Sequence, residues 1–151
     1  MNRIVVLSVL LCSAPLVSAA DDAKDEMKKL EGPWKVASAE IDGNAFDAKK
    51  LGMTGLLVAE GKLIFQNDGK DVMAFAFTVD PSRKPKAMDW VKDKESITLP
   101  TIYALDGDEL KMCMPLLPRK GSGDKVDIKR PESFDTKGKP VLTILLKREK
   151  K

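Results

Sequence analysis

Residues 30–36 read Leu-Glu-Gly-Pro-Trp-Lys-Val, and in this stretch the pattern of apolar side chains changes from helical to alternating. The segment Asp21 to Glu31 has acidic residues in its first turn and apolar residues at helical spacing, so it predicts a short helix. Gly32 and Pro33 are residues that end helices. Trp34 opens an alternating run, so the chain is expected to pass from a short helix directly into a first β-strand.

This first strand is expected to end at the turn-forming residues Asp42-Gly43-Asn44. Strict alternation assigns its residues to two sides, with Trp34, Val36 and Ser38 on one and Ala37, Ala39 and Ile41 on the other. A loop or a single helical turn is expected next, around Asp47 to Leu51.

Further strand-like runs follow, at residues 55–59, 62–66, 71–79, 86–91, 96–105, 109–116 and 140–147. The strongest signal is a hairpin at Asn67-Asp68-Gly69, because the run after it places Met73, Phe75 and Phe77 on one face. Pro100 lacks a backbone N–H, so it restricts the start of the run 96–105 to a sheet edge or a bulge.

Eight short strands joined mostly by tight turns predict an antiparallel sheet, because parallel crossovers need a dozen or more residues. Such a meander removes its exposed edges by closing into an up-and-down barrel. The sequence therefore predicts an all-β, eight-stranded antiparallel barrel, with Met27 and Leu30 of the helix covering one end. The polar stretch 118–139 is too long for a tight turn, and we weigh two alternatives for it, a functional loop and a disordered one.

The first twenty residues have the pattern of a secretory signal peptide: a basic start, an apolar run and a small-residue end at Val17-Ser18-Ala19-Ala20. The apolar run is too short for a membrane span, which needs about twenty residues. We therefore expect export to the periplasm or the medium, with no transmembrane anchor after cleavage and residues 21–151 forming one domain. Cys113 is the one cysteine of this domain, which excludes an internal disulfide, and we expect it to be buried.

The composition argues against several classes of function. The chain has no histidine, which removes the commonest general base and the usual zinc ligands. The net charge is +3, and acids and lysines alternate along most of the chain, so nucleic acid is an unexpected partner. Met112-Cys113-Met114 suggests a soft-metal site, but alternation points Cys113 away from both methionines. We predict no catalytic residues, no metal and no cofactor.

Gly32-Pro33-Trp34 resembles the Gly-x-Trp that begins the first barrel strand in lipocalins and related calycins. The resemblance implies that Trp34 plugs the closed end of the barrel and that a late arginine, here Arg148, packs across its ring. Gly32, Trp34 and Arg148 are thus expected to close the barrel.

Nearly the whole of residues 21–151 also resembles an uncharacterised lipocalin-like domain family of exported proteins, abundant in planctomycete bacteria. That resemblance rests on these residues: 30–34, Ser38, Gly43, Asp80-Pro81, 84–89, Ile102-Tyr103, 106–110, Cys113, Arg130-Pro131, Phe134 and 146–148. The family implies a fold and an export habit, without implying a reaction.

The leading hypothesis is a noncatalytic barrel that binds a small, mainly apolar ligand. Its expected liners are Met73, Phe75, Phe77 and Ile102, joined by Leu142, Ile144 and Leu146 of the last strand. The rival hypothesis is a filled barrel that serves as a structural or interaction module for a cell-envelope protein. A solvent-reachable apolar cavity of roughly a few hundred Å³ favours the first hypothesis, and a packed interior favours the second.

Arg130 and Phe134, in the long loop, also have two interpretations. As recognition elements, Phe134 would lie over the barrel mouth and Arg130 would meet an anionic group of the ligand. As a structural clamp, Phe134 would pack on the barrel and Arg130 would pair with a local acid. Loops of this length need anchors to stay ordered, which favours the clamp.

Overall fold

The computed structural model of the chain describes residues 18–92, 97–117 and 128–150. Residues 1–17, which make up most of the predicted signal peptide, lie outside the described residues. Residues 118–127 of the long loop lie outside them too. The elements are α1 (Ala19–Leu30), β1 (Gly32–Ile41), β2 (Asn44–Phe46), the 3₁₀ turn η1 (Ala48–Leu51), β3 (Gly55–Ala59), β4 (Lys62–Asn67), β5 (Lys70–Asp80), β6 (Lys86–Lys92), β7 (Ile97–Asp106), β8 (Glu109–Pro115) and β9 (Val141–Arg148).

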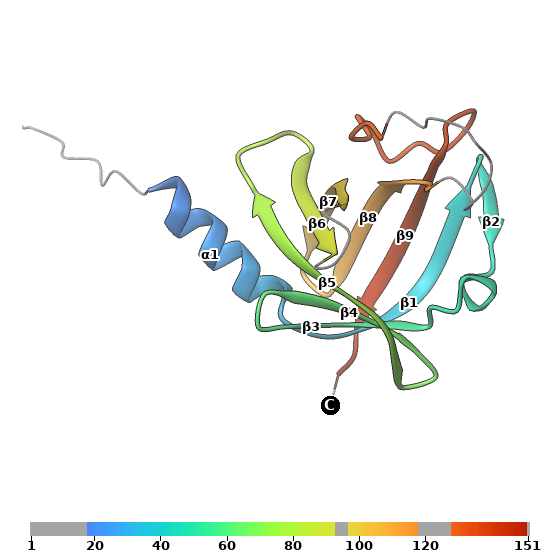
Figure 1. The fold of residues 1–151 in the computed structure, drawn as a ribbon, viewed down its shortest axis with the longest axis horizontal. Helices are drawn as coiled ribbons and strands as arrows, with labels where there is room; N and C mark the ends of the chain where they lie inside the picture. The colour runs from blue at the N-terminus through green and yellow to red at the C-terminus, as the bar shows by residue number, and fades with distance from the viewer. Residues whose placement is uncertain (1–17, 93–96, 118–127, 151) are drawn as a thin grey trace, which may run out of the picture.

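Eight of the strands form a closed antiparallel barrel, as the sequence predicts (Figure 1). Neighbours in sequence pair from β3 through to β9, and β1 closes the barrel by pairing with β3 on one edge and β9 on the other. The short strand β2 was not expected. It pairs with the last residues of β1, from Ala39 to Ile41, and lies outside the eight-strand order.

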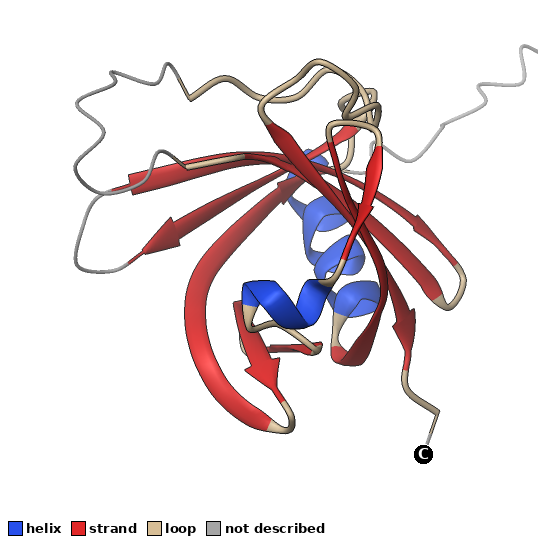
Figure 2. Cartoon of the chain, turned by 90° about the vertical axis from the view of Figure 1, so that its right-hand side faces the viewer, coloured by secondary structure: helices blue, strands red, loops and turns tan. Residues whose placement is uncertain are grey.

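The two ends of the barrel are covered by different segments. At the helix end, α1 leads into β1, and the turns β3–β4, β5–β6 and β7–β8 lie there too. The opposite end, which we call the mouth, carries the β4–β5 turn and residues 42–54. Figure 2 views the barrel from the mouth, with η1 nearest the viewer and α1 behind it.

A β-bulge in β1 changes the predicted sides of this strand. The pairing with β9 shifts between Val36 and Ser38, so Ala37 is an extra residue without a cross-strand partner. Beyond the bulge the alternation is inverted, so Ala39 faces the barrel core, as Trp34 and Val36 do, while Ser38 is exposed. The prediction that Ser38 shares the side of Trp34 was wrong, because one unpaired residue reverses the face of every residue after it.

Pro100 lies where the sequence predicted, on a strand edge. It pairs with Asp89 of β6, and the pairing of β7 with β8 begins only at Ile102. The first half of β7 thus has no β8 neighbour, so the missing N–H of Pro100 costs no ladder hydrogen bond there.

The barrel interior is filled by the protein's own side chains. One contiguous cluster of buried residues runs from Leu30 at the helix end to Leu142 near the mouth. Its largest fully buried members are Trp34, Tyr103, Phe65, Leu30, Leu56, Leu63, Met88, Leu110, Met112, Ile144 and Leu146. A ligand would therefore bind outside this packed interior, unless it displaces core side chains.

Candidate ligand-binding site

Trp34 forms a plug at the helix end. Its indole Nε1 donates a hydrogen bond to the carbonyl oxygen of Leu30 at 2.8 Å, and the Arg148 guanidinium carbon lies 4.1 Å from the ring centroid. Arg148 also donates to the carbonyl oxygens of Lys29 and Glu31, both at 2.7 Å, and so caps the end of α1. The contact between Trp34 and Arg148 is the one that the resemblance implied.

Gly32 is required by the same arrangement. Its φ is +117°, a conformation that side chains with a Cβ rarely adopt, and an added Cβ would lie 3.2 Å from Arg148 Nη1. Because Gly32 has no side chain, the Arg148 guanidinium can bond to the carbonyl oxygens of α1 and cover the Trp34 ring at the same time.

Glu26 ties α1 to the barrel through a buried carboxylate. One of its oxygens accepts a hydrogen bond from the Tyr103 hydroxyl at 3.3 Å and from Lys86 Nζ at 2.5 Å, and Lys29 pairs with the other. Burial raises the pKa of Glu26, but its hydrogen bonds and ion pairs with Lys86 and Lys29 together outweigh that effect and hold the pKa below its usual value. Burial, together with the nearby Glu26 carboxylate, raises the pKa of Tyr103. This end is thus closed by both polar and apolar contacts.

An aromatic group lies in the interior. The ring centroids of Phe65 and Trp90 are 5.3 Å apart, and Phe75 lies 6.1 Å from Phe65 and 5.6 Å from Trp90. Among the described residues, Trp90 Nε1 is the buried side-chain polar atom that has no hydrogen-bond partner. Trp90 lines none of the pockets described below, so the aromatic group belongs to the filled core.

The mouth is covered by the segment from β2 to β3. Phe46, Ala48, Leu51 and Met53 are partly buried and pack against the barrel core. Asp47 caps η1 by accepting a hydrogen bond from the backbone N–H of Lys49 at 3.0 Å, and Met53 N–H closes the turn onto the Ala48 carbonyl oxygen at 3.2 Å. This local bonding folds residues 46–53 into a compact cover.

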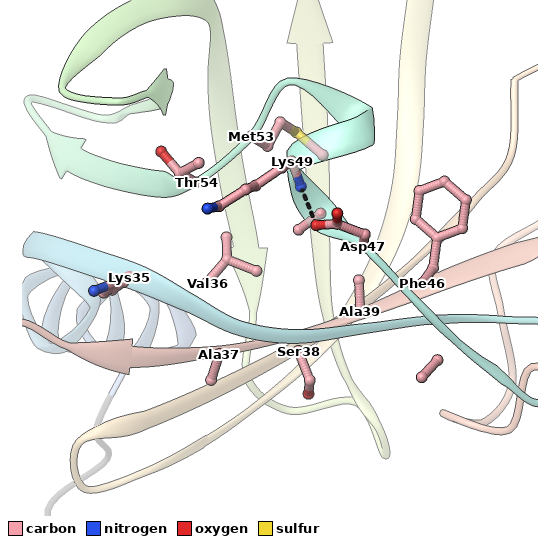
Figure 3. Close-up of a pocket in the computed structure, with 12 residues that line it drawn as sticks. Lys35, Val36, Ala37, Ser38, Ala39, Phe46, Asp47, Lys49, Met53 and Thr54 are labelled. Carbon is pink, nitrogen blue, oxygen red and sulfur yellow. Dashed lines mark hydrogen bonds between the residues drawn. The ribbon is translucent and has the colours of Figure 1, made fainter.

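A pocket of about 350 Å³ separates this cover from β1 (Figure 3). It arises because β1 changes partner: its pairing with β3 ends at Lys35, and its pairing with β2 begins at Ala39. Ala39 of the barrel core and Val36, which packs against that core, form the floor, and Phe46, Ala48 and Met53 line the opposite side. We call this the mouth pocket. An apolar ligand in this pocket would contact the barrel core directly, and no core side chain would have to move.

Polar groups of the mouth pocket are concentrated on its rim. In Figure 3 the side chain of Lys49 extends over Val36 toward the end of the pocket where Lys35 lies, and Asp47 lies at the other end. Within residues 18–92, 97–117 and 128–150, no acidic partner pairs with the ammonium group of Lys35 or Lys49. The pocket thus combines an apolar floor with two unpaired cations.

The residues predicted as liners lie elsewhere. Phe77 is buried in the core, Phe75 is half-buried against it, and Met73 is 42% exposed on β5. The residues of the last strand, Leu142, Ile144 and Leu146, are also in the filled core. None of them lines the mouth pocket.

The predicted interior position of Ile102 requires correction. Ile102 packs with Cys113 and Val141 in a second cluster, while its neighbours Thr101 and Tyr103 are buried on the other side of β7. Cys113 lies opposite Ile102 on β8, and Met112 and Met114 belong to the barrel core. The prediction that Cys113 points away from both methionines is confirmed, and burial raises the pKa of its thiol.

The described part of the long loop is a clamp on the outer face. Arg130 pairs with Asp89 at 2.5 Å and donates hydrogen bonds to the carbonyl oxygens of Met88 and Thr101 at 3.3 and 2.7 Å. Phe134 packs on the outer cluster, with Lys111 Nζ 5.2 Å from its ring centroid. This arrangement corresponds to the clamp alternative, because Arg130 pairs with a local acid and Phe134 packs on the barrel.

The clamp makes a prediction about Cys113. Replacing Phe134 with Ala removes the ring that packs on the outer cluster, so the thiol should open to solvent more often and react about ten-fold faster with iodoacetamide. The rate is measured by mass spectrometry on the peptide that contains Cys113. Phe46→Ala, at the mouth, is the matched control and should leave the rate unchanged. Equal rates for wild type and Phe134→Ala would show that the loop does not shield the cluster.

The described residues form neither a metal-binding cluster nor a membrane-spanning helix. No group of three or more His, Cys, Asp or Glu side chains within them could hold a metal ion. In the same part of the chain, no helix has the length and apolar character needed to span a membrane.

Comparison with known proteins returned no match: no protein-family model, no curated protein and no solved structure is similar to this chain. The relationship to a lipocalin-like family therefore stays a prediction from the residues quoted above. The function has to be argued from the site itself.

Proposed function

We propose that this protein is an exported, noncatalytic barrel that binds a small, mainly apolar ligand in the mouth pocket. The observation that carries the proposal is the composition of that pocket. Ala39 of the buried core and Val36, which packs against that core, both line this pocket. The volume of about 350 Å³ falls within the range for small-molecule sites, which begins at about 300 Å³.

The geometry also explains why such a ligand need not enter the barrel. A seam between two strand pairings leaves room beside Val36, and the cover from Phe46 to Met53 is held by a few local hydrogen bonds. Small movements of η1 would enlarge the seam without breaking the eight-strand ladder. Burial of an alkyl chain there contributes roughly 0.8 kcal/mol per CH₂ group.

The alternative function is a structural or interaction module of the cell envelope. The filled interior favours this alternative, since one continuous cluster occupies the space in which a ligand of a hollow barrel would lie. The mouth pocket favours the binding function, and the two candidates differ in whether this pocket takes up a small molecule.

The experiment uses the neutral apolar fluorophore N-phenyl-1-naphthylamine as the probe. Wild-type protein should bind it with increased fluorescence. Val36→Phe replaces a small side chain of the pocket floor with an aromatic ring that occupies the pocket. The substitution should weaken binding about ten-fold, equivalent to about 1.4 kcal/mol. Val72→Phe is the matched control, because Val72 is exposed on β5 and does not line the mouth pocket. Equal effects of the two substitutions, or no binding by wild type, would refute the proposed function.

A further inference from the structure

The cations of the mouth pocket have no structural task that explains their position. Lys35 and Lys49 come from different elements, β1 and the η1 turn, yet both line the one pocket. Both side chains are exposed, and neither has an ion-pair partner among the described residues. By contrast, Glu26 and Asp108 at the helix end pair with the cations Lys29, Lys86, Arg148 and Lys150.

We infer that the ligand of the mouth pocket is an amphiphilic anion, an apolar chain that ends in one carboxylate. Its chain would lie on Val36 and Ala39, and its carboxylate would lie at the end of the pocket where Lys35 lies and toward which Lys49 extends in Figure 3. This inference rests on the proposed function and adds the charge of the ligand to it. The attraction between these two lysines and the ligand carboxylate is local, because the chain as a whole carries a net charge of only +3.

Asp47 sets the orientation of such a ligand. Its carboxylate lines the same pocket at the other end in Figure 3 and accepts a hydrogen bond from the backbone of Lys49. One carboxylate against two ammonium groups leaves the lining positive, and repulsion from Asp47 disfavours placing the anionic group at the Asp47 end of the pocket. The field of these charges therefore favours the anionic group at the Lys35 end of the pocket, with the chain along the apolar floor.

The experiment compares octanoate with 1-octanol by isothermal titration calorimetry on the same protein. The two probes share an eight-carbon chain and differ in charge. We expect octanoate to bind about five-fold more tightly at low salt, with the ratio falling as ionic strength screens the lysines. Lys35→Gln and Lys49→Gln should each reduce the affinity for octanoate about three-fold and leave the affinity for 1-octanol unchanged.

Two further variants sharpen the test. Lys50→Gln removes a neighbouring exposed lysine of η1 that does not line the pocket, and it should change neither affinity. Asp47→Asn retains a capping side chain and removes the negative charge, so it should raise the affinity for octanoate alone. Equal binding of the two probes, unchanged by any lysine variant, would overturn the anionic ligand while leaving the proposed function standing. Absence of binding by both probes would overturn the proposed function, and the inference with it.

Discussion

Replacing Trp34 with Phe is expected to lower the free energy of unfolding by about 3 kcal/mol, measured by urea denaturation. Two losses combine in this value. The smaller ring leaves a void in the plug, and the Leu30 carbonyl oxygen loses the indole N–H that satisfies it at 2.8 Å. The face that Arg148 covers is also reduced, which weakens the cation–π contact.

Trp90→Phe is the matched control for this prediction. Trp90 is as buried as Trp34, at 2% against 1% exposure, but its Nε1 has no hydrogen-bond partner among the described residues. The substitution loses a similar volume and no hydrogen bond, and it removes an unsatisfied N–H, so it should cost about 1 kcal/mol. If Trp34→Phe is no more damaging than Trp90→Phe, Trp34 fills space and does not act as a plug.

Glu26→Gln is expected to lower the free energy of unfolding at pH 7 by about 2 kcal/mol, because the Tyr103 hydroxyl and Lys86 lose a charged acceptor. The value allows for the partial exposure of Lys86, which screens its ion pair. Asp25→Asn changes an exposed acid beside Glu26 on the same helix, without an ion pair in the described structure, and should have no effect.

The effect of Glu26 should depend on pH with a definite sign. Its pKa in the folded protein lies below the ordinary value of 4.5, so the folded state favours the ionised form and the contribution is fully present above about pH 5. As the pH falls through the lowered pKa, the carboxylate takes up a proton and the contribution is lost. The stability difference between wild type and Glu26→Gln should therefore shrink from pH 5 toward pH 2. A difference that stays constant over this range would exclude Glu26 as the charged acceptor.

The strands and turns could be predicted because their signals are local. Alternating runs separated by Gly- and Asp-containing turns specify each hairpin within about ten residues, and the structure adds only the short strand β2. The bulge at Ala37 could not be predicted, because Ala37 and Ser38 are both small and neither marks a face. Strict alternation placed Val36 correctly, on the side of Trp34, but the bulge reverses the sides of the residues that follow it, so the position of Ala39 could not be predicted.

The site was harder to predict because it depends on contacts between distant segments. The mouth pocket exists where β1 changes partner from β3 to β2, and a three-residue strand leaves too short a pattern to recognise. Glu26 looked like one of several acids in a helical turn, and only the fold brings it to Tyr103, 77 residues away. A usable signal was present at Asp47, a capping residue followed by two lysines, which fits a polar turn at a barrel mouth.

Binding at the mouth pocket is tested most directly by NMR on protein labelled at the methionine ε-methyl groups, titrated with octanoate and then with 1-octanol. Met53 lines the mouth pocket, while Met27 packs at the helix end, with its methyl carbon near Gly61. The proposed function predicts that the Met53 signal shifts in a saturable way with at least one probe, while the Met27 signal stays in place. A saturable shift of Met27 without one of Met53, or no saturable shift of either, would contradict it.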